Sequence, residues 1–187
     1  MGTGAHPWER EEAAGELVFP NPTPERPDTL VSLDDGCVPE STRDGATVAR
    51  TRRAVSRAAG SELTGLQHVV VPPGKLNAPP HCHSAEEELV VVLAGEGALE
   101  LGAALSGRDA SAASESHHVR AGHVVARPAG SGRAHAFRAG EDGLTLLAYG
   151  SKEPNDICYY PRSRKVYLRG VGPIARLEHL DYWDGED

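Results

Sequence analysis

The chain has 187 residues, which is enough for a single domain with a core of useful size. Its formal net charge of -8 argues against a nucleic-acid-binding protein, because phosphate recognition needs a concentrated positive face. No apolar run is long enough to span a membrane, and the polar, acidic start from Met1 to Glu12 is unlike a signal peptide. We therefore expect a cytoplasmic protein that has neither nucleic acid nor a membrane as a partner.

The composition favours a protein built from strands. Charged residues make up 25% of the chain and hydrophobic residues 39%, as in ordinary soluble domains. The 21 glycines and 14 prolines are plentiful, aromatic residues are few, and no long helical pattern occurs. This balance is typical of short strands that are joined by many turns.

The three cysteines, Cys37, Cys82 and Cys158, are scattered and form no C-x-x-C pair. An odd and scattered set does not predict a disulfide framework. Each can be a reactive thiol, but we favour the interpretation that they are small buried hydrophobic residues.

Residues 1–45 are rich in proline and charge, most clearly in the segment from Phe19 to Pro27. This composition predicts an extended N-terminal arm and leaves residues 46–187 as a single domain. The sequence does not choose between a disordered arm and one laid across the body or a partner subunit. No internal repeat is visible, so we expect one barrel and not two.

A basic cluster follows the arm, at Arg50, Arg52, Arg53 and Arg57. It lies in an alanine-rich stretch, and we expect a short helix there. A charge cluster on a helix most often faces water, so we favour a solvated helix face over a binding patch.

Short extended segments separated by glycine and proline turns predict strands through the middle of the chain. They lie at 66–71, 79–83, 88–93, 118–120, 124–127, 134–138 and 144–149. Many short strands at this spacing indicate an antiparallel sandwich or barrel.

Three further predictions concern the connections. We interpret Gly95-Glu96-Gly97 as a turn, so that the strand at 88–93 returns as a hairpin through 98–101. Residues 102–116 are mostly Gly, Ala and Ser and predict a surface loop. The tail from Val166 to Trp183 alternates again and predicts edge strands.

The stretch from Pro79 to Gly95 carries the residues best suited to chemistry. Side chains alternate along a strand, so His81 and His83 point the same way, and two imidazoles on one face can chelate a single ion. Glu88 begins the next strand, where it shares a face with apolar residues. A carboxylate there is costly unless it is paired or coordinated, and metal coordination removes that cost.

His135 supplies a fourth ligand from a distant strand, on a face that it shares with Phe137. Three neutral imidazoles and one carboxylate suit one divalent Fe, Mn, Ni, Co or Zn ion and leave room for water or substrate. We also assign Glu88 as the candidate catalytic residue, because a carboxylate near the ion can move a proton.

Other polar residues near this stretch have more ordinary interpretations. A lone H-x-H pair is weak evidence for metal binding, since paired histidines are common on exposed strands. Glu86 and Glu87 can be surface charges, and His68 can line the pocket, although a core histidine with satisfied hydrogen bonds is more common. We expect exposed positions for His117, His118 and His123. Further lining residues are expected at Tyr149, Arg127 or Arg133.

Considered together with their spacing, these residues resemble the two motifs of the cupin superfamily. The first motif, G-x5-H-x-H-x3,4-E-x6-G, is matched by Gly74, His81, His83, Glu88 and Gly95. The second, G-x5-P-x-G-x2-H-x3-N, is matched by Gly122, Pro128, Gly130 and His135. Gly74 to His81 is one residue longer than the pattern, and Gly130 to His135 is two residues longer. Ala139 replaces the closing Asn.

The resemblance covers roughly residues 65–150 and implies an all-β jelly-roll barrel, also called a double-stranded β-helix. It implies that His81, His83, Glu88 and His135 are metal ligands. The segment from Glu153 to Ser163 is similar to the region after the barrel in a group of bacterial single-barrel cupins. Many single-barrel cupins are dimers, and an exposed barrel edge and a long arm also favour a homodimer.

The leading hypothesis is a mononuclear metalloenzyme that acts on a small polar metabolite. Because cupins include dioxygenases, isomerases and lyases, the resemblance implies oxygenase and isomerase or lyase chemistry equally. The alternative is a non-catalytic protein that binds a sugar or metabolite through a metal clamp, and a third hypothesis is a barrel that the metal only stabilises. A polar pocket with an acid or base beside an open side of the ion favours the enzyme, and a sealed or apolar cavity favours the stabilised barrel.

Overall fold

The computed structural model describes residues 27–104, 115–178 and 180–186. In this part of the chain the regular elements are strands, apart from the short helix α2 (Val55–Ala58) and the 3-10 turn η1 (Pro161–Ser163). The first five strands are β1 (Glu40–Asp44), β2 (Ala49–Ala54), β3 (Thr64–Val71), β4 (Cys82–His83) and β5 (Glu88–Ala104). The others are β6 (Glu115–Arg120), β7 (Val124–Arg127), β8 (Arg133–Ser151), β9 (Ile157–Tyr160), β10 (Lys165–Leu168) and β11 (Ile174–Arg176).

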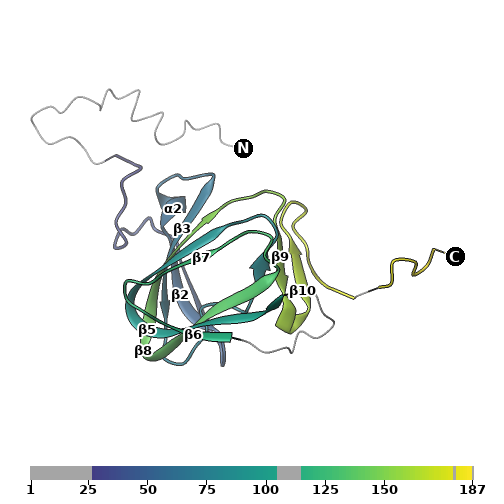
Figure 1. The fold of residues 1–187 in the computed structure, drawn as a ribbon. Coiled ribbons are helices and arrows are strands. Elements are labelled where there is room, and N and C mark those ends of the chain that lie inside the picture. Colours follow the sequence, from purple (N-terminus) through teal and green to yellow (C-terminus); the bar gives the residue numbers. More distant parts are fainter. Residues whose placement is uncertain (1–26, 105–114, 179, 187) are drawn as a thin grey trace, which may run out of the picture.

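The strands form two antiparallel sheets that curve around a common interior (Figure 1). The larger sheet has the order β1-β2-β3-β8-β5-β6, with β7 also paired to β5. The smaller sheet has the order β11-β10-β9-β4 and closes one side of the barrel. This arrangement confirms the predicted all-β class. Of the edge strands expected in the tail, β11 lies at an edge, whereas β10 lies between β9 and β11.

The two longest strands, β5 and β8, pair along their whole length and are bent by three register shifts. One shift lies between Gly95 and Gly97, where Gly95 has a φ of 77°. A Cβ at Gly97 would collide with the carbonyl oxygen of Arg138, so only glycine lets the two backbones approach this closely. The predicted hairpin at this place is therefore wrong: β5 bends and continues.

The two halves of β5 differ in their second neighbour. Residues 88–91 pair with β7, whereas residues 96–101 pair with β6. The segments 134–138 and 144–149 are likewise one strand, β8, and not two. Glycines at a bulge resemble the glycines of a turn in sequence, because both positions need backbone conformations that other residues avoid. Of the predicted loop at 102–116, residues 105–114 lie outside the described residues.

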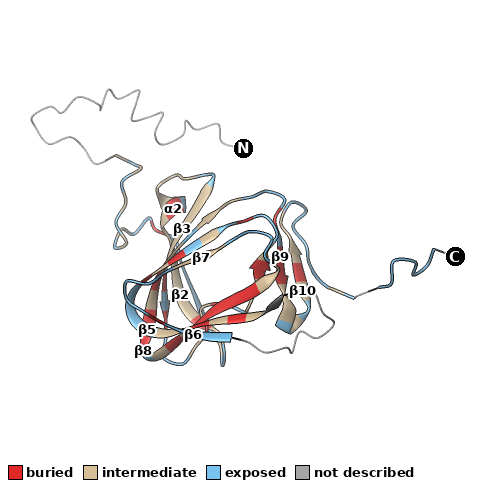
Figure 2. Ribbon diagram, in the orientation of Figure 1, coloured by how far each residue is buried: buried red, intermediate tan, exposed pale blue. Residues whose placement is uncertain are grey.

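Buried residues of β3, β5, β6 and β8, all strands of the large sheet, form the apolar core of the barrel (Figure 2). The cluster contains Val69, Val71, Val90, Val92, Leu99, Leu101, Val119, Phe137, Ala139, Leu144 and Leu146. Phe137 is fully buried at its centre. This apolar layer fixes which face of each strand looks inward, and it thereby fixes the direction of the polar residues that share that face.

The arginine cluster was expected on a helix, and this prediction is wrong for most of it. Arg50, Arg52 and Arg53 lie on β2, and only residues 55–58 are helical. β2 is paired on both sides, with β1 and with β3, so its backbone hydrogen bonds are satisfied within the sheet. Pairing with neighbours that are distant in sequence outweighs the helix propensity of a short alanine-rich segment.

Residues 40–44, at the end of the predicted arm, form β1 and pair with β2. The proline-rich part of that arm, residues 1–26, lies outside the described residues. Within the described part of the chain, no helix is long and apolar enough to cross a membrane.

Candidate metal centre

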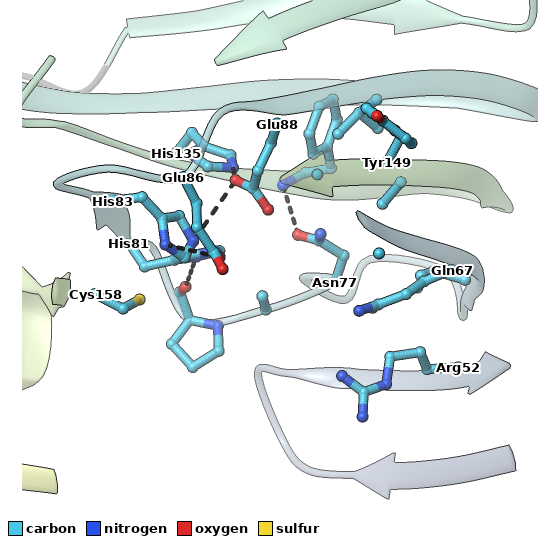
Figure 3. Close-up of a pocket in the computed structure, with 18 of the residues that line it drawn as sticks. Arg52, Gln67, Asn77, His81, His83, Glu86, Glu88, His135, Tyr149 and Cys158 are labelled. Atoms are coloured by element: carbon cyan, nitrogen blue, oxygen red, sulfur yellow. Dashed lines mark hydrogen bonds and ion pairs between the residues drawn. The ribbon is translucent and has the colours of Figure 1, made fainter. Parts of the chain in front are cut away.

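A cavity of about 430 Å³ opens between the two sheets and holds the candidate site (Figure 3). Its walls come from β2, β3, β5 and β8 on the large sheet, from β4, β9 and β10 on the small sheet, and from the loop before β4. All four predicted ligands, His81, His83, Glu88 and His135, line this cavity. The site is therefore assembled from segments that are far apart in the sequence.

His81, Glu88 and His135 form one compact group, with one donor atom of each lying within 4.8 Å of the others. The His135 Nε2 atom is 3.0 Å from Glu88 Oε2, and the rings of His81 and His135 have centroids 4.8 Å apart. The backbone fixes this pair, because the His81 N–H donates to the His135 carbonyl at 3.1 Å and the His135 N–H donates back at 2.8 Å.

His83 adjoins this group through the same carboxylate. Its Nε2 atom is 3.8 Å from Glu88 Oε2, and its ring lies edge-on to that of His81 with centroids 5.2 Å apart. His81 and His83 both face the cavity, as strand alternation predicts, while Cys82 between them is buried on the other face. The structure thus brings the four residues together, and their role as metal ligands remains a prediction.

Both histidines of the H-x-H pair have one ring nitrogen held by an acceptor. The Nδ1–H of His81 donates to the Pro79 carbonyl at 2.9 Å, and the Nδ1–H of His83 donates to Asp156 Oδ2 at 2.7 Å. Each bond fixes the ring orientation and the tautomer. The Nε2 lone pairs are consequently left for a cation in the cavity, which is the usual arrangement of metal-binding histidines.

The Glu88 carboxylate also fits a bound cation. Its Oε2 atom is buried and has no hydrogen bond of good geometry, although His135 Nε2 lies at 3.0 Å. An unsatisfied buried carboxylate oxygen is costly, and a divalent cation would satisfy it.

The charge states suit the same role. Burial, followed by the neighbouring His135, lowers the pKa of His81 to about 4. Burial by itself would raise the pKa of Glu88, but contact with His135 and the charges of His81 and His83 lower it to about 2. At neutral pH His81 is therefore neutral and Glu88 is ionised, which are the forms that bind a metal ion.

Asp156 is a site residue that sequence reasoning missed. It is fully buried, and besides His83 it accepts hydrogen bonds from the backbone N–H groups of Ala85, at 3.0 Å, and Glu86, at 3.2 Å. Burial by itself would raise the pKa of Asp156, but the bonds from His83 and Ala85 lower it. An ionised Asp156 holds the His83 ring and links the loop before β5 to the turn before β9.

Glu86 was interpreted as a surface charge, and this is wrong. Its side chain is buried, accepts from Arg169 at 2.7 Å and from the Glu153 N–H at 3.1 Å, and lies 3.6 Å from His83 Nδ1. His83, Glu86 and Asp156 also lie close enough together to hold an ion. Because Arg169 and backbone N–H groups already satisfy both carboxylates, we interpret this cluster as the support of the His83 ring.

Nothing local marked Asp156 or Glu86 as buried. The one sequence signal was the segment from Glu153 to Ser163, whose resemblance to the region after a cupin barrel placed it near the domain without giving it a role. The contacts of Asp156 with His83 span 73 residues, so they depend on how β9 docks against β4.

The remaining predicted lining residues divide into three groups. His68 faces away from the cavity, which is lined by its neighbours Gln67 and Val69, so its predicted place in the pocket or the core is wrong. Tyr149 lines the cavity but is 45% exposed, so it lies at the rim. Arg127 and Arg133 line a smaller adjoining cavity behind Glu88 and His135. His117, His118 and His123 are exposed, as predicted.

Cys158 contributes a buried thiol to the cavity wall beside His81 and His83. Burial raises the pKa of Cys158 to about 12, so the thiol is protonated at neutral pH. Cys82 is also buried, whereas Cys37 is exposed, and all three are free. The prediction of buried small residues is thus confirmed for Cys82 and Cys158 and wrong for Cys37.

The fold and this cavity define a jelly-roll β-barrel with a histidine-rich centre. Comparison with known families agrees, because the profile of the Cupin domain matches residues 67–149. The chain therefore contains a cupin-type domain, and the predicted jelly-roll barrel is confirmed. No protein of curated function matches the chain.

Solved structures with the same fold include two proteins related to sugar phosphate isomerases. A candidate sugar phosphate isomerase from Acidithiobacillus ferrooxidans is 20% identical, with a TM-score of 0.65 over 82% of this chain and 97% of that chain. A sugar phosphate isomerase of the cupin superfamily from Silicibacter pomeroyi is 26% identical, with a TM-score of 0.54 over 68% of this chain and 76% of that chain. The first likeness shows the fold alone.

The ligand assignment predicts the effect of replacing His83. We expect His83→Ala to lose stoichiometric metal while the barrel stays folded, because the side chain lies at the cavity wall and not in the apolar core. Elemental analysis of the purified variant measures the metal, and circular dichroism measures the fold. His117→Ala, on the exposed face of β6, is the control and should keep its metal. Normal metal content in His83→Ala would refute the assignment.

The hydrogen bond between His83 and Asp156 predicts that a change at Asp156 lowers metal affinity less than the loss of His83 itself. We expect Asp156→Asn to reduce metal affinity by about 10- to 100-fold, because the amide holds the imidazole less firmly than a carboxylate. Competition with a chromogenic chelator measures this affinity. Asp142→Asn changes an exposed acid on β8 in the same way and should leave the affinity unchanged. Equal affinities for the two variants would contradict the role of Asp156.

Proposed function

We propose that this chain is a mononuclear metal-dependent enzyme of the isomerase or lyase class, which acts on a small polar metabolite. The observation that carries the proposal is the convergence of three imidazoles and one carboxylate on the wall of an open cavity of about 430 Å³. A metal that only stabilised the barrel would be enclosed by protein ligands, whereas this group borders space for a ligand.

His81, His83, His135 and Glu88 would hold the ion, and divalent Fe, Mn, Ni, Co and Zn all suit this donor set. The ion would supply Lewis acidity towards a carbonyl or hydroxyl oxygen of the substrate. Glu88, ionised at neutral pH, is the group that we propose accepts and returns a proton at the substrate carbon.

Polar amide groups elsewhere on the cavity wall would orient the substrate. The Asn77 Oδ1 atom accepts the Phe137 N–H at 2.8 Å, which fixes the side-chain amide beside the histidines. Gln67 lies across the cavity from them (Figure 3). These amides, of which Asn77 is fixed by its hydrogen bond, favour a substrate with several hydroxyl or carbonyl oxygens over an apolar one.

The likeness to the protein from Silicibacter pomeroyi supports isomerase chemistry over oxygen chemistry. That protein bears the name of a sugar phosphate isomerase and is 26% identical over 68% of this chain. An isomerisation between a 2-hydroxy aldehyde and a hydroxy ketone moves one proton between neighbouring carbons and a second proton between their oxygens, and it needs no oxidant. A metal ion and a nearby base are therefore sufficient for such a reaction.

The test is anaerobic turnover in deuterium oxide. Metal-loaded protein is incubated with a panel of small aldoses and ketoses and their phosphates, and proton NMR follows solvent deuterium entering the carbon beside the carbonyl. We expect exchange and isomerisation without oxygen, loss of both after chelation, and recovery when metal is restored. Turnover that requires oxygen would contradict the proposal, and saturable binding without any exchange would favour the metal-clamp alternative.

Glu88 is assigned two roles, and one substitution separates them. We expect Glu88→Gln to bind metal more weakly and, at saturating metal, to lower kcat by about 10²- to 10⁴-fold, because an amide accepts no proton. Glu87→Gln, at the exposed neighbouring position, is the control. An unchanged kcat at saturating metal would leave Glu88 as a ligand alone, and an unchanged metal affinity would remove it from the ligand set.

We also propose a cytoplasmic homodimer. β1 is exposed at all five positions and forms an edge of the large sheet. Leu180, Tyr182 and Trp183 near the end of the chain are 65%, 84% and 69% exposed, and apolar side chains of this size favour burial against a partner. Light scattering should give twice the chain mass of 19.8 kDa, and deletion of residues 180–187 should shift the protein towards monomer. A monomer before deletion would contradict the proposal.

A further inference from the structure

Two arginines on β2 face the same cavity as the candidate metal centre. Arg50 and Arg52 are alternate residues of one strand, so they share a face, and both line the cavity. Arg53, on the other face of β2, instead pairs with Glu40 at 2.8 Å. Figure 3 shows Arg52 across the cavity from the histidines.

These two guanidinium groups have no acidic partner among the described residues. Arg50 donates through Nη1 to the carbonyl of Asn77 at 2.8 Å, and the Nε atom of Arg52 is buried without a hydrogen-bond partner. Leaving a buried guanidinium N–H unsatisfied costs free energy. Burial and then the charge of Arg52 lower the pKa of Arg50, so the two groups also repel one another. An anion placed between them would satisfy the unpaired N–H of Arg52 and offset the repulsion between the two guanidinium groups.

The other charges around the cavity do not supply this anion. Glu86 is paired with Arg169 at 2.7 Å, and Glu88 lies among the histidines. Lys152, another cation on the wall, donates to the Ser61 carbonyl at 2.9 Å. Within a chain of formal charge -8, this side of the cavity is therefore locally positive. The net negative charge of the protein repels anions, so the positive charge on this side of the cavity is a local feature and not part of a general attraction for anions.

The two sides of the cavity are close together. The Tyr160 ring stacks on His81 with centroids 5.8 Å apart, and Tyr160 lines the same cavity as Arg50 and Arg52. Asn77, whose carbonyl accepts from Arg50, is four residues before His81 in the same loop. A short molecule can therefore reach from the arginines to the histidines.

We propose that Arg50 and Arg52 form a subsite for the phosphoryl group of a small phosphorylated substrate, whose reactive carbons then lie beside His81, Glu88 and His135. Two guanidinium groups match the double negative charge of a phosphate monoester, and each can donate two parallel hydrogen bonds to its oxygens. This inference rests on the proposed function for the reaction, but the anion subsite itself does not need the metal.

The test measures binding of inorganic phosphate to the full chain, with and without metal, by isothermal titration calorimetry. We expect Arg52→Ala and Arg50→Ala each to weaken phosphate binding at least about tenfold, because each removes a charge-assisted pair of hydrogen bonds. Arg53→Ala, on the other face of the same strand, is the matched control and should change affinity less than twofold. The metal-free protein should bind phosphate as the metal-loaded protein does, and added salt should weaken binding.

Several results would overturn the inference. Unchanged phosphate affinity in both Arg50→Ala and Arg52→Ala would do so, as would loss of phosphate binding on removal of the metal alone. Acetate that binds more tightly than phosphate would replace the phosphoryl assignment with a carboxylate one. If Arg52→Ala does not fold by circular dichroism, Arg52→Gln is measured instead, with the same expectation.

The outcome is separable from that of the proposed function. A chain that holds no metal but binds phosphate through Arg52 would retain the subsite and lose the proposed reaction. A chain that isomerises its substrate with an unchanged KM in Arg52→Ala would retain the reaction and lose the subsite.

Discussion

Placing a carboxylate among imidazoles inside an apolar barrel is the constraint on which the rest of this structure depends. Glu88 Oε2 is buried 3.0 Å from His135 without a satisfied hydrogen bond, and its charge is costly unless a cation shares the space. The paired backbone bonds between His81 and His135 hold the surrounding rings in place. The apolar core beside them, which includes Phe137, is filled by other side chains, so these polar side chains point into the cavity. The barrel therefore maintains a concentrated polar site at the end of a well-packed interior.

The small sheet has a larger part in this site than its size indicates. β9 pairs with β4 and carries Cys158 and Tyr160 to the cavity, and the turn before it places Asp156 beneath His83. Asp156 also accepts backbone N–H groups in the loop before β5, so one carboxylate holds both His83 and the segment that leads to Glu88. The region after the matched domain is thus part of the centre and not an appendage.

The cavity has two chemically different sides, and this asymmetry links the two proposals. Histidines and Glu88 form one side, where protons and a metal would act, and arginines on β2 form the other, where charge is unbalanced among the described residues. A substrate that binds both sides is held in one orientation, which lowers the entropic cost of reaction at the metal side. Arg50 and Arg52 come from the strand that the sequence most clearly misrepresented, since its alanines indicated a helix.

The sequence by itself determined the all-β class and most strand segments of the barrel, and its resemblance to the cupin motifs implied the gathering of His81, His83, Glu88 and His135, because strand alternation and motif spacing are local patterns. It did not determine that Gly95 and Gly97 bend a continuous strand, that Arg50 and Arg52 face the cavity, or that Asp156 supports His83. Each of these depends on which distant segment pairs with which, and a glycine, an arginine or an aspartate looks the same locally whether it lies in a turn, on a surface or under a ligand. Only the packing of the two sheets decided among these possibilities, because burial and hydrogen bonding are satisfied between segments and not within them.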